Sequence, residues 1–338
     1  MIGKMYSSTA DNSPAFWGLR PSTPEYIPLD SEEGKSFSEI TGFQPDLAEI
    51  MISARKFPYG FFRVKENNYA KTYKYFVKIV SHERFAMEKF SLAIMAYLHS
   101  KGVPCFVSNL IQGQNRKGKY CVTISPYLEF NYFSGMRSEA RAMGKLLRVV
   151  HQALTDYPKA EQIKNNWQKR YKVFTNLRDI LHQETPSWWQ WGPEKKGMLI
   201  TGFPLLNFGQ DIAQVVHGDI NFGNLLFPYS ANNPILIDFE NSKYSYFPVY
   251  FDIAMLLERF FLVGRDKNEA EQLFNAFQEG YGEIQFDKLF MSMKAMTIRS
   301  LFLLTERTFK NIITPASEWK KFFILLEQSE DKCSFLIK

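Results

Sequence analysis

Residues 213–252 decide the fold, and they read AQVVHGDINFGNLLFPYSANNPILIDFENSKYSYFPVYFD. Three polar side chains mark this stretch: Asp219, Asn224 five residues later, and Asp238 at the end of a short apolar run. An abrupt change from a buried-type strand to a carboxylate is unusual, because a carboxylate is costly to place next to a core. The stretch is therefore the first place to look for a chemical site.

The segment between Asn224 and Asp238 has the pattern of a hairpin. Two apolar runs, 225–227 and 235–237, are separated by residues 228–233, which contain Pro, Ser and Asn. Such residues favour turns, so the runs are predicted to pair as two strands. Pairing would bring Asn224 and Asp238 close together.

Two acids and an amide in this arrangement suit phosphoryl transfer to a hydroxyl group. That chemistry needs a carboxylate that orients the hydroxyl and accepts its proton, and it needs oxygen ligands for a divalent metal. Asp219 is predicted to be the base. Asp238 is predicted to be the main Mg²⁺ ligand and Asn224 a second one, because two neighbouring carboxylates are unfavourable unless a cation lies between them.

Three other residues of the stretch have weaker predictions. His217 is interpreted as a histidine that braces the loop rather than as a base, since Asp219 already fills that role. Glu240 remains a possible metal-associated group. Asp252 is interpreted as an acid in the first turn of a helix, favoured by the helix dipole, in preference to a direct catalytic role.

The N-terminal third is predicted to form a small sheet with one long helix. Strands are expected around 50–54, 61–65, 73–80 and 120–124, and a helix over 82–99. From about residue 135 the pattern becomes mostly helical, with helices expected over 143–154, 158–182, 252–263, 284–310 and 315–328. An Asn268–Glu271 pair is expected to cap one further helix.

These features predict an α+β fold with two lobes, a β-rich N-terminal one and a larger, mostly helical C-terminal one. The expected boundaries are an extension over residues 1–36, an N-lobe over 37–128 and a C-lobe over 129–338. The extension is rich in Ser, Pro and Gly and is predicted to be irregular.

The pattern of His217, Asp219 and Asn224, followed by Asp238 and Asp252, resembles the aminoglycoside phosphotransferase and choline kinase superfamily. The order of these residues matches the HxDxxxxN loop of that family, its strand-ending Asp and its downstream helix Asp. The segment GKLLRVVH at residues 144–151 also resembles a helix of that family. The resemblance implies a bilobal protein-kinase-like fold and the use of ATP and Mg²⁺.

The same resemblance implies a lysine that binds the phosphates and a glutamate that holds it. Lys78 lies in the middle of a predicted strand and is the candidate lysine. Glu88 on the following helix is its expected partner, with Glu83 as a weaker choice. The hinge between the lobes is expected at residues 125–128, where the backbone around Ser125 and Tyr127 would contact adenine.

Composition and charge exclude several other classes. The net charge of +6 is mild for 338 residues and the basic residues are scattered, so a nucleic-acid partner is not expected. The three cysteines suggest neither a disulfide framework nor a zinc site, and no apolar run is long enough for a membrane span. A cytoplasmic protein is expected, and the sequence does not indicate its oligomeric state.

The predicted reaction is transfer of the γ-phosphate of Mg·ATP to a hydroxyl of a small molecule. Acids and bases after residue 239 are about balanced, which disfavours a polycationic aminoglycoside and leaves an amino alcohol, a sugar or another hydroxyl compound open. The aromatic cluster Trp188, Trp189 and Trp191 either packs or binds substrate. A protein kinase and a non-catalytic nucleotide-binding module are the alternatives.

Overall fold

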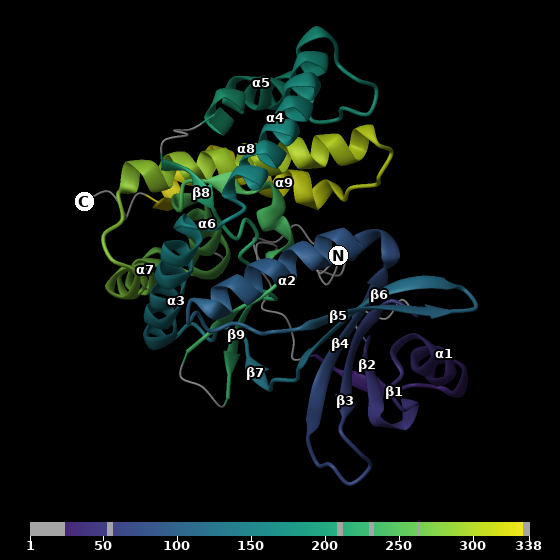
Figure 1. Ribbon diagram of the computed structural model, residues 1–338. Helices are drawn as coiled ribbons and strands as arrows, with labels where there is room; N and C mark the ends of the chain where they lie inside the picture. The colour runs from purple at the N-terminus through teal and green to yellow at the C-terminus, as the bar shows by residue number, and fades with distance from the viewer. Residues whose placement is uncertain (1–23, 53–56, 208–211, 230–232, 263, 334–338) are drawn as a thin grey trace. The chain divides into compact units, whose positions relative to one another are not determined.

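The computed structural model describes residues 24–52, 57–207, 212–229, 233–262 and 264–333 (Figure 1). The described chain divides into two compact units, one made of residues 24–134 and 222–240, the other of residues 135–221 and 241–333. The first unit is β-rich and the second is mostly helical, as the sequence predicts. The predicted boundaries at residues 36 and 128 stay predictions, and the hairpin that carries Asn224 and Asp238 groups with the first unit.

The first unit is built on a six-stranded antiparallel sheet in the order β1-β2-β3-β4-β6-β5, and a smaller sheet in the order β10-β9-β7. Its elements are β1 (Tyr26–Pro28), α1 (Ser31–Thr41), β2 (Ala48–Met51), β3 (Gly60–Lys65), β4 (Tyr73–Ser81), α2 (Phe85–Ser100), β5 (Asn109–Asn115), β6 (Gly118–Pro126), β7 (Phe130–Asn131), β9 (Leu225–Pro228) and β10 (Ile235–Leu236). Figure 1 shows α1 beside β1 and β2, while α2 lies beside β5 and β6.

Alternation along β4 decides which side chains reach the core and which remain for a site. Val77 and Ile79 are fully buried in the cluster formed with Phe37 and Ile40 of α1. Successive side chains of a strand point to opposite faces, so Lys78 points away from that cluster. The face opposite α1 is therefore where a functional cavity can form.

The sequence predicts the central strands and misses the edges of this sheet. The predicted strands at 50–54, 61–65 and 73–80 correspond to β2, β3 and β4, and the helix predicted over 82–99 corresponds to α2. Three elements were not predicted, namely β1, α1 and β5. β1 has only three residues, β5 is largely polar, and Gly34 interrupts the helical pattern of α1. Part of the expected irregular extension is thus a strand and a helix.

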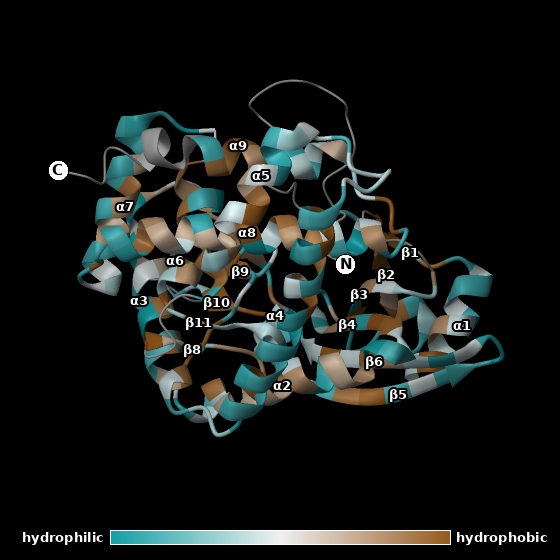
Figure 2. Ribbon diagram, turned by 90° about the horizontal axis from the view of Figure 1, so that it is seen from above, coloured by the Kyte–Doolittle hydropathy of each residue, from teal (hydrophilic) through white to brown (hydrophobic). Residues whose placement is uncertain are grey.

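The second unit contains most of the helices. Its elements are α3 (Arg137–Thr155), α4 (Ala160–Gln183), α5 (Gly192–Gly202), β8 (Gln214–Val215), β11 (Tyr246–Phe247), α6 (Tyr250–Leu256), α7 (Lys267–Tyr281), α8 (Phe286–Phe309) and α9 (Ala316–Cys333). A π-helical turn, Leu257–Leu262, continues α6. Figure 2 shows brown and teal segments along the helices, as expected for helices that bury one face. The N-cap of α7 is Asp266, whose side chain accepts the Glu269 N–H, so the predicted cap at Asn268 is wrong by two residues.

The tryptophan cluster packs against α9. The buried Trp189 donates its indole N–H to the Gly192 carbonyl at 2.9 Å, and its ring lies 5.7 Å from that of Trp319. The Trp191 ring stacks on Trp319 at 5.9 Å. These contacts favour the packing interpretation over substrate binding.

None of the helices in the described ranges has the length and apolar character needed to cross a bilayer.

Two glycines allow α3 and α7 to cross in close contact. A Cβ added at Gly144 would lie 2.2 Å from the Phe277 carbonyl oxygen, and one added at Gly280 would lie 2.1 Å from the Arg141 carbonyl oxygen. Real Cβ atoms do not approach backbone so closely, so the two helices would have to separate. The glycine of the GKLLRVVH segment is therefore needed for packing.

We predict that Gly144→Ala lowers the free energy of unfolding by about 1–3 kcal/mol, because the added methyl overpacks the α3–α7 contact. Gly197 in α5 is the matched control, since a Cβ there meets nothing within 4 Å. Gly197→Ala should raise stability by about 0.4–1 kcal/mol. Urea denaturation of both variants checks this, and equal stability of Gly144→Ala and the unchanged protein would contradict the packing argument.

Candidate active site

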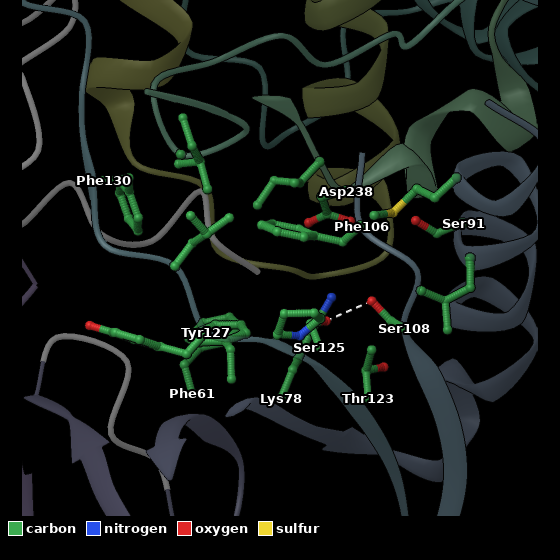
Figure 3. Close-up of a pocket in the computed structure, with 18 of the residues that line it drawn as sticks. Phe61, Lys78, Ser91, Phe106, Ser108, Thr123, Ser125, Tyr127, Phe130 and Asp238 are labelled. Atoms are coloured by element: carbon green, nitrogen blue, oxygen red, sulfur yellow. Dashed lines mark hydrogen bonds between the residues drawn. The ribbon is translucent and has the colours of Figure 1, made fainter. Parts of the chain in front are cut away.

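The first unit contains a cavity between α2 and the face of the sheet opposite α1 (Figure 3). It comprises about 1070 Å³ of space not filled by protein atoms, part of it open to solvent. Lys78 and Thr123 line it from paired positions of β4 and β6. Glu88, Ser91 and Met95 line it from α2, at the helical spacing that puts side chains on one face. The size suits a nucleotide.

Lys78 and Glu88 form an ion pair inside this cavity. The Lys78 Nζ lies 2.8 Å from one carboxylate oxygen of Glu88 and 3.1 Å from the other. Burial lowers the pKa of Lys78, but the charges of Asp238, Glu88 and Glu240 outweigh burial and raise it. The ammonium group is therefore positively charged at neutral pH. Its partner is Glu88, as the sequence predicts, rather than Glu83.

Asn224 and Asp238 are brought together by the predicted hairpin. β9 and β10 pair antiparallel with Leu225 opposite Leu236, and the Ile237 N–H donates to the Asn224 carbonyl at 2.9 Å. Asp238 follows directly and lines the cavity. Its φ of 62° lies in the left-handed region, which non-glycine residues occupy rarely and at a cost. Strain of this kind occurs most often at functional sites, where surrounding structure holds it.

Charge in the cavity is unbalanced in a way that suits a metal ion. Arg84 bonds to Glu240 and lies 3.6 Å from Glu88. Burial and the neighbouring Asp238 raise the pKa of Glu240. The two basic side chains, Lys78 and Arg84, thus lie near three acidic ones, Glu88, Asp238 and Glu240. The acidic groups are in excess by one. The donors that the chain offers for a metal, the Asp238 carboxylate and the Asn224 amide oxygen, are of the kind that Mg²⁺ prefers, so these residues fit that ion.

Aromatic side chains also line the cavity. Phe61 and Phe76 stack with ring centroids 5.8 Å apart, and Phe106 and Tyr127 also line the wall (Figure 3). Flat apolar side chains are suited to the faces of a purine.

The predicted hinge residues Ser125 and Tyr127 both line this cavity. The Ser125 hydroxyl lies 2.6 Å from that of Ser108 (Figure 3). The Tyr127 N–H donates to the Lys74 carbonyl at 2.9 Å, so the carbonyl and the ring of Tyr127 are what it can offer a nucleotide. The roles of both hinge residues remain predictions.

Asp219 belongs to the second unit, where it is held by two polar partners. The Arg259 Nη1 lies 2.7 Å from Asp219 Oδ1, and the Asn241 amide donates to Oδ2 at 3.2 Å. Burial raises the pKa of this carboxyl, but the charge and hydrogen bond of Arg259 outweigh it, with His217 and Asn221 adding to the effect. The pKa of Asp219 therefore lies below its usual range, and the group is ionised at neutral pH.

Asp252 lies in the first turn of α6, as predicted, and has a further role. Its two carboxylate oxygens accept the backbone N–H groups of His217 and Gly218, each at 2.8 Å. The fully buried carboxylate also lies 3.2 Å from the His151 ring. Asp252 thus braces the loop that carries Asp219, and the helix-dipole interpretation is incomplete. His217 helps as predicted, because its Nδ1 accepts the Asp219 N–H at 3.2 Å.

Sequence reasoning missed Arg84 and Arg259, the two arginines that contact the predicted acids. Arg84 lies four residues before Glu88, a helical spacing that could have indicated contact. Arg259 reaches Asp219 across 40 residues from a π-helical turn, which no sequence pattern marks. The structure therefore gathers Lys78, Glu88, Asn224 and Asp238 in the first unit and adds Arg259 to Asp219 in the second.

We predict that Asp252→Asn lowers the free energy of unfolding by about 1–3 kcal/mol, because an amide has one acceptor oxygen for two backbone donors. Asp266→Asn is the matched control, since Asp266 caps α7 and Asn caps helices as well as Asp does. Its stability should change by only a few tenths of a kcal/mol. If both variants unfold at the same denaturant concentration, Asp252 is an ordinary helix-terminal acid.

Comparison with known proteins was made for sequence and for fold. Residues 61–286 match the model of the phosphotransferase enzyme family, APH. No curated protein matches the chain in sequence.

Solved structures with the same fold include several kinases. The GDP complex of aminoglycoside 2'-phosphotransferase-IIIa has a TM-score of 0.57 at 13% identity, and the match covers 90% of this chain and 99% of that one. A microcompartment-associated aminopropanol kinase gives 0.55 at 12% identity, with 91% and 99% covered. An ethanolamine kinase from Plasmodium vivax gives 0.52 at 12% identity, with 89% and 86% covered. At these identities the likeness shows the fold, which is the predicted protein-kinase-like one.

Proposed function

This chain belongs to the phosphotransferase enzyme family, and on that premise we propose that it transfers the γ-phosphate of ATP to a hydroxyl group of a small molecule. The observation that carries the proposal is the cavity of the first unit. The Lys78–Glu88 ion pair and the strained Asp238 line this same cavity. A buried cation beside carboxylates and an aromatic slot has the chemistry of a metal–nucleotide site.

In the proposed complex, aromatic side chains of the cavity hold the adenine ring and Lys78 donates hydrogen bonds to phosphate oxygens. Glu88 keeps the Lys78 ammonium in position through the ion pair. Phe61 and Phe76 line the cavity and are already stacked on each other, so the adenine ring would bind without large rearrangement. The GDP complex of a structural neighbour supports nucleotide binding in this fold.

Asp238 and Asn224 would hold Mg²⁺. A bound Mg²⁺ would neutralise charge on the phosphates as the transfer proceeds. The hairpin keeps the two ligands in register through the Ile237–Asn224 backbone hydrogen bond. Glu240, which is tied to Arg84, is left as an outer residue that balances charge.

Asp219 is proposed to orient the acceptor hydroxyl and to take its proton. The hydroxyl oxygen forms a bond to the γ-phosphorus while the bond from that phosphorus to the β–γ bridging oxygen breaks, and ADP leaves with the bonding electrons. Because Arg259 keeps Asp219 ionised, its carboxylate is ready to accept a hydrogen bond from the hydroxyl at neutral pH. The Asp252 brace fixes the backbone on which Asp219 stands.

The proposal is tested with Asp219→Asn in an assay for ADP release over a panel of hydroxylated metabolites. We expect kcat to fall at least about 100-fold, because the base is lost, while the dissociation constant for ATP changes less than about twofold. Asp179→Asn is the matched control, since Asp179 is a half-exposed surface acid paired with Arg178. It should retain full activity.

Two results would contradict the proposal. Turnover by Asp219→Asn equal to that of the unchanged protein would remove the base assignment. ATP binding without turnover on any acceptor, in the unchanged protein, would instead indicate the nucleotide-binding module that was considered as an alternative.

A further inference from the structure

Arg299 on α8 is a buried cation that forms no ion pair with a described residue. Only 6% of the residue is exposed to solvent. Within the part of the chain that the structure describes, its guanidinium makes no hydrogen bond and has no carboxylate oxygen within 4.0 Å. Its guanidinium carbon lies over the rings of Phe247 and Phe251, 5.5 Å from the centroid of each.

A guanidinium in this position is unusual, because a buried charge is unfavourable unless it is paired and hydrogen-bonded. The two rings stack on each other, with centroids 4.3 Å apart, and provide a flat support for the guanidinium. The rings accept no conventional hydrogen bond, and none of the five N–H donors of Arg299 bonds to a described residue. A planar guanidinium held in this way is suited to a carboxylate or a phosphate, which it can bind through two parallel hydrogen bonds.

Contacts place Arg299 near the loop that carries the proposed base, because its guanidinium lies over the ring of Phe251, and the next residue, Asp252, accepts the backbone N–H groups of His217 and Gly218. Burial lowers the pKa of Arg299 to about 10, Asp219 and Asp252 raise it, and Arg170 and Arg259 lower it further. Arg259 contacts Asp219 directly at 2.7 Å. The charges of Arg170, Arg259 and Arg299 therefore influence one another in the second unit, which also contains Asp219.

The nearby acids of the second unit are already engaged. Glu258 lies 3.4 Å from both Arg259 and Lys321, and Glu306 bonds to Arg170. Asp252 is occupied by the backbone of the loop. Arg170 and Arg259 are paired with these acids, whereas Arg299 has no carboxylate oxygen within 4.0 Å among the described residues, so an anionic group on the acceptor would supply the missing partner.

We infer that the acceptor is a hydroxylated compound that carries an anionic group, a carboxylate or a phosphate, and that Arg299 binds that group. The inference rests on the proposed phosphotransferase function and names its substrate class. Arg299 is then a specificity-determining residue, and the acceptor differs in charge from the amino alcohols named for two of the structural neighbours.

The test compares acceptors in pairs that differ by one anionic group. Serine is ethanolamine with a carboxylate added, and glycerate and glycerol 3-phosphate are anionic counterparts of glycerol. Calorimetry without nucleotide measures binding of each compound, and ADP release measures its KM. We expect at least one anionic compound to bind about tenfold or more tightly than its parent, and this preference to disappear in Arg299→Gln while the KM for ATP changes less than about twofold.

Two further variants separate recognition from folding. Arg299→Lys keeps the charge and should retain part of the preference, because an ammonium binds anions without the bidentate geometry. Arg178→Gln is the matched control, since Arg178 on α4 also lies over an aromatic ring, 4.6 Å from that of Phe203, but pairs with Asp179. It should keep the full preference, and thermal melts of all variants show whether Arg299→Gln is folded.

The outcomes distinguish this inference from the proposed function. If the unchanged protein binds ethanolamine and glycerol as tightly as their anionic counterparts, the inference is overturned, whether or not they are phosphorylated and whether or not Arg299→Gln folds. If Arg299→Gln raises the KM for ATP and leaves the acceptor preference intact, the anion that Arg299 binds belongs to the nucleotide, and the inference is also overturned. Binding that depends on Arg299 without any phosphate transfer supports the anion site and contradicts the proposed reaction.

Discussion

The ion pair between Lys78 and Glu88 is the interaction on which the rest of the first unit depends. It joins the central strand of the sheet to α2 across a cavity that is otherwise largely apolar. A buried ammonium needs negative neighbours, and Asp238 and Glu240 supply further ones. Arg84 adds a second cation beside Glu88 and Glu240, and the strained backbone at Asp238 holds a further carboxylate beside the pair, so the acidic groups remain in excess.

In the second unit, the carboxylates are held by backbone N–H groups and by an arginine instead of a lysine. Both carboxylate oxygens of Asp252 accept backbone N–H groups of the loop that carries Asp219, so Asp252 fixes the conformation of this loop and does not itself react. Asp219 is kept ionised by Arg259, and Arg299 adds a second positive charge that no acid of the described chain pairs. Arg299 is therefore the arginine of this region that a bound anion could pair.

Much of the candidate site could be predicted from the sequence, because its key residues follow patterns of short range. The hairpin that joins Asn224 to Asp238 was visible as two apolar runs around a turn, and Lys78 stood in a strand ahead of the helix that carries Glu88. The arginines could not be predicted in the same way. Arg259 meets Asp219 across 40 residues, and Arg299 reaches its aromatic support from a helix whose apolar pattern is otherwise ordinary. Contacts of this kind depend on how helices pack, which a single sequence does not specify.

The same distinction explains the fold. Central strands such as β4 alternate clearly and were predicted, whereas the edge strands β1 and β5 are short or polar and obtain their structure from their neighbours. The role of Asp252 was also beyond local reasoning, since its position in the first turn of α6 gave a sufficient explanation by itself.

The most direct test of this account measures the affinity of the protein for ATP by calorimetry, with and without Mg²⁺, and repeats it with Asp238→Asn. Three carboxylates around two cations should make Mg²⁺ essential for tight binding, so we expect the unchanged protein to bind Mg·ATP at least about tenfold more tightly than ATP alone. Asp238→Asn should lose most of that difference. Equal affinity for ATP with and without the metal in the unchanged protein would contradict the account.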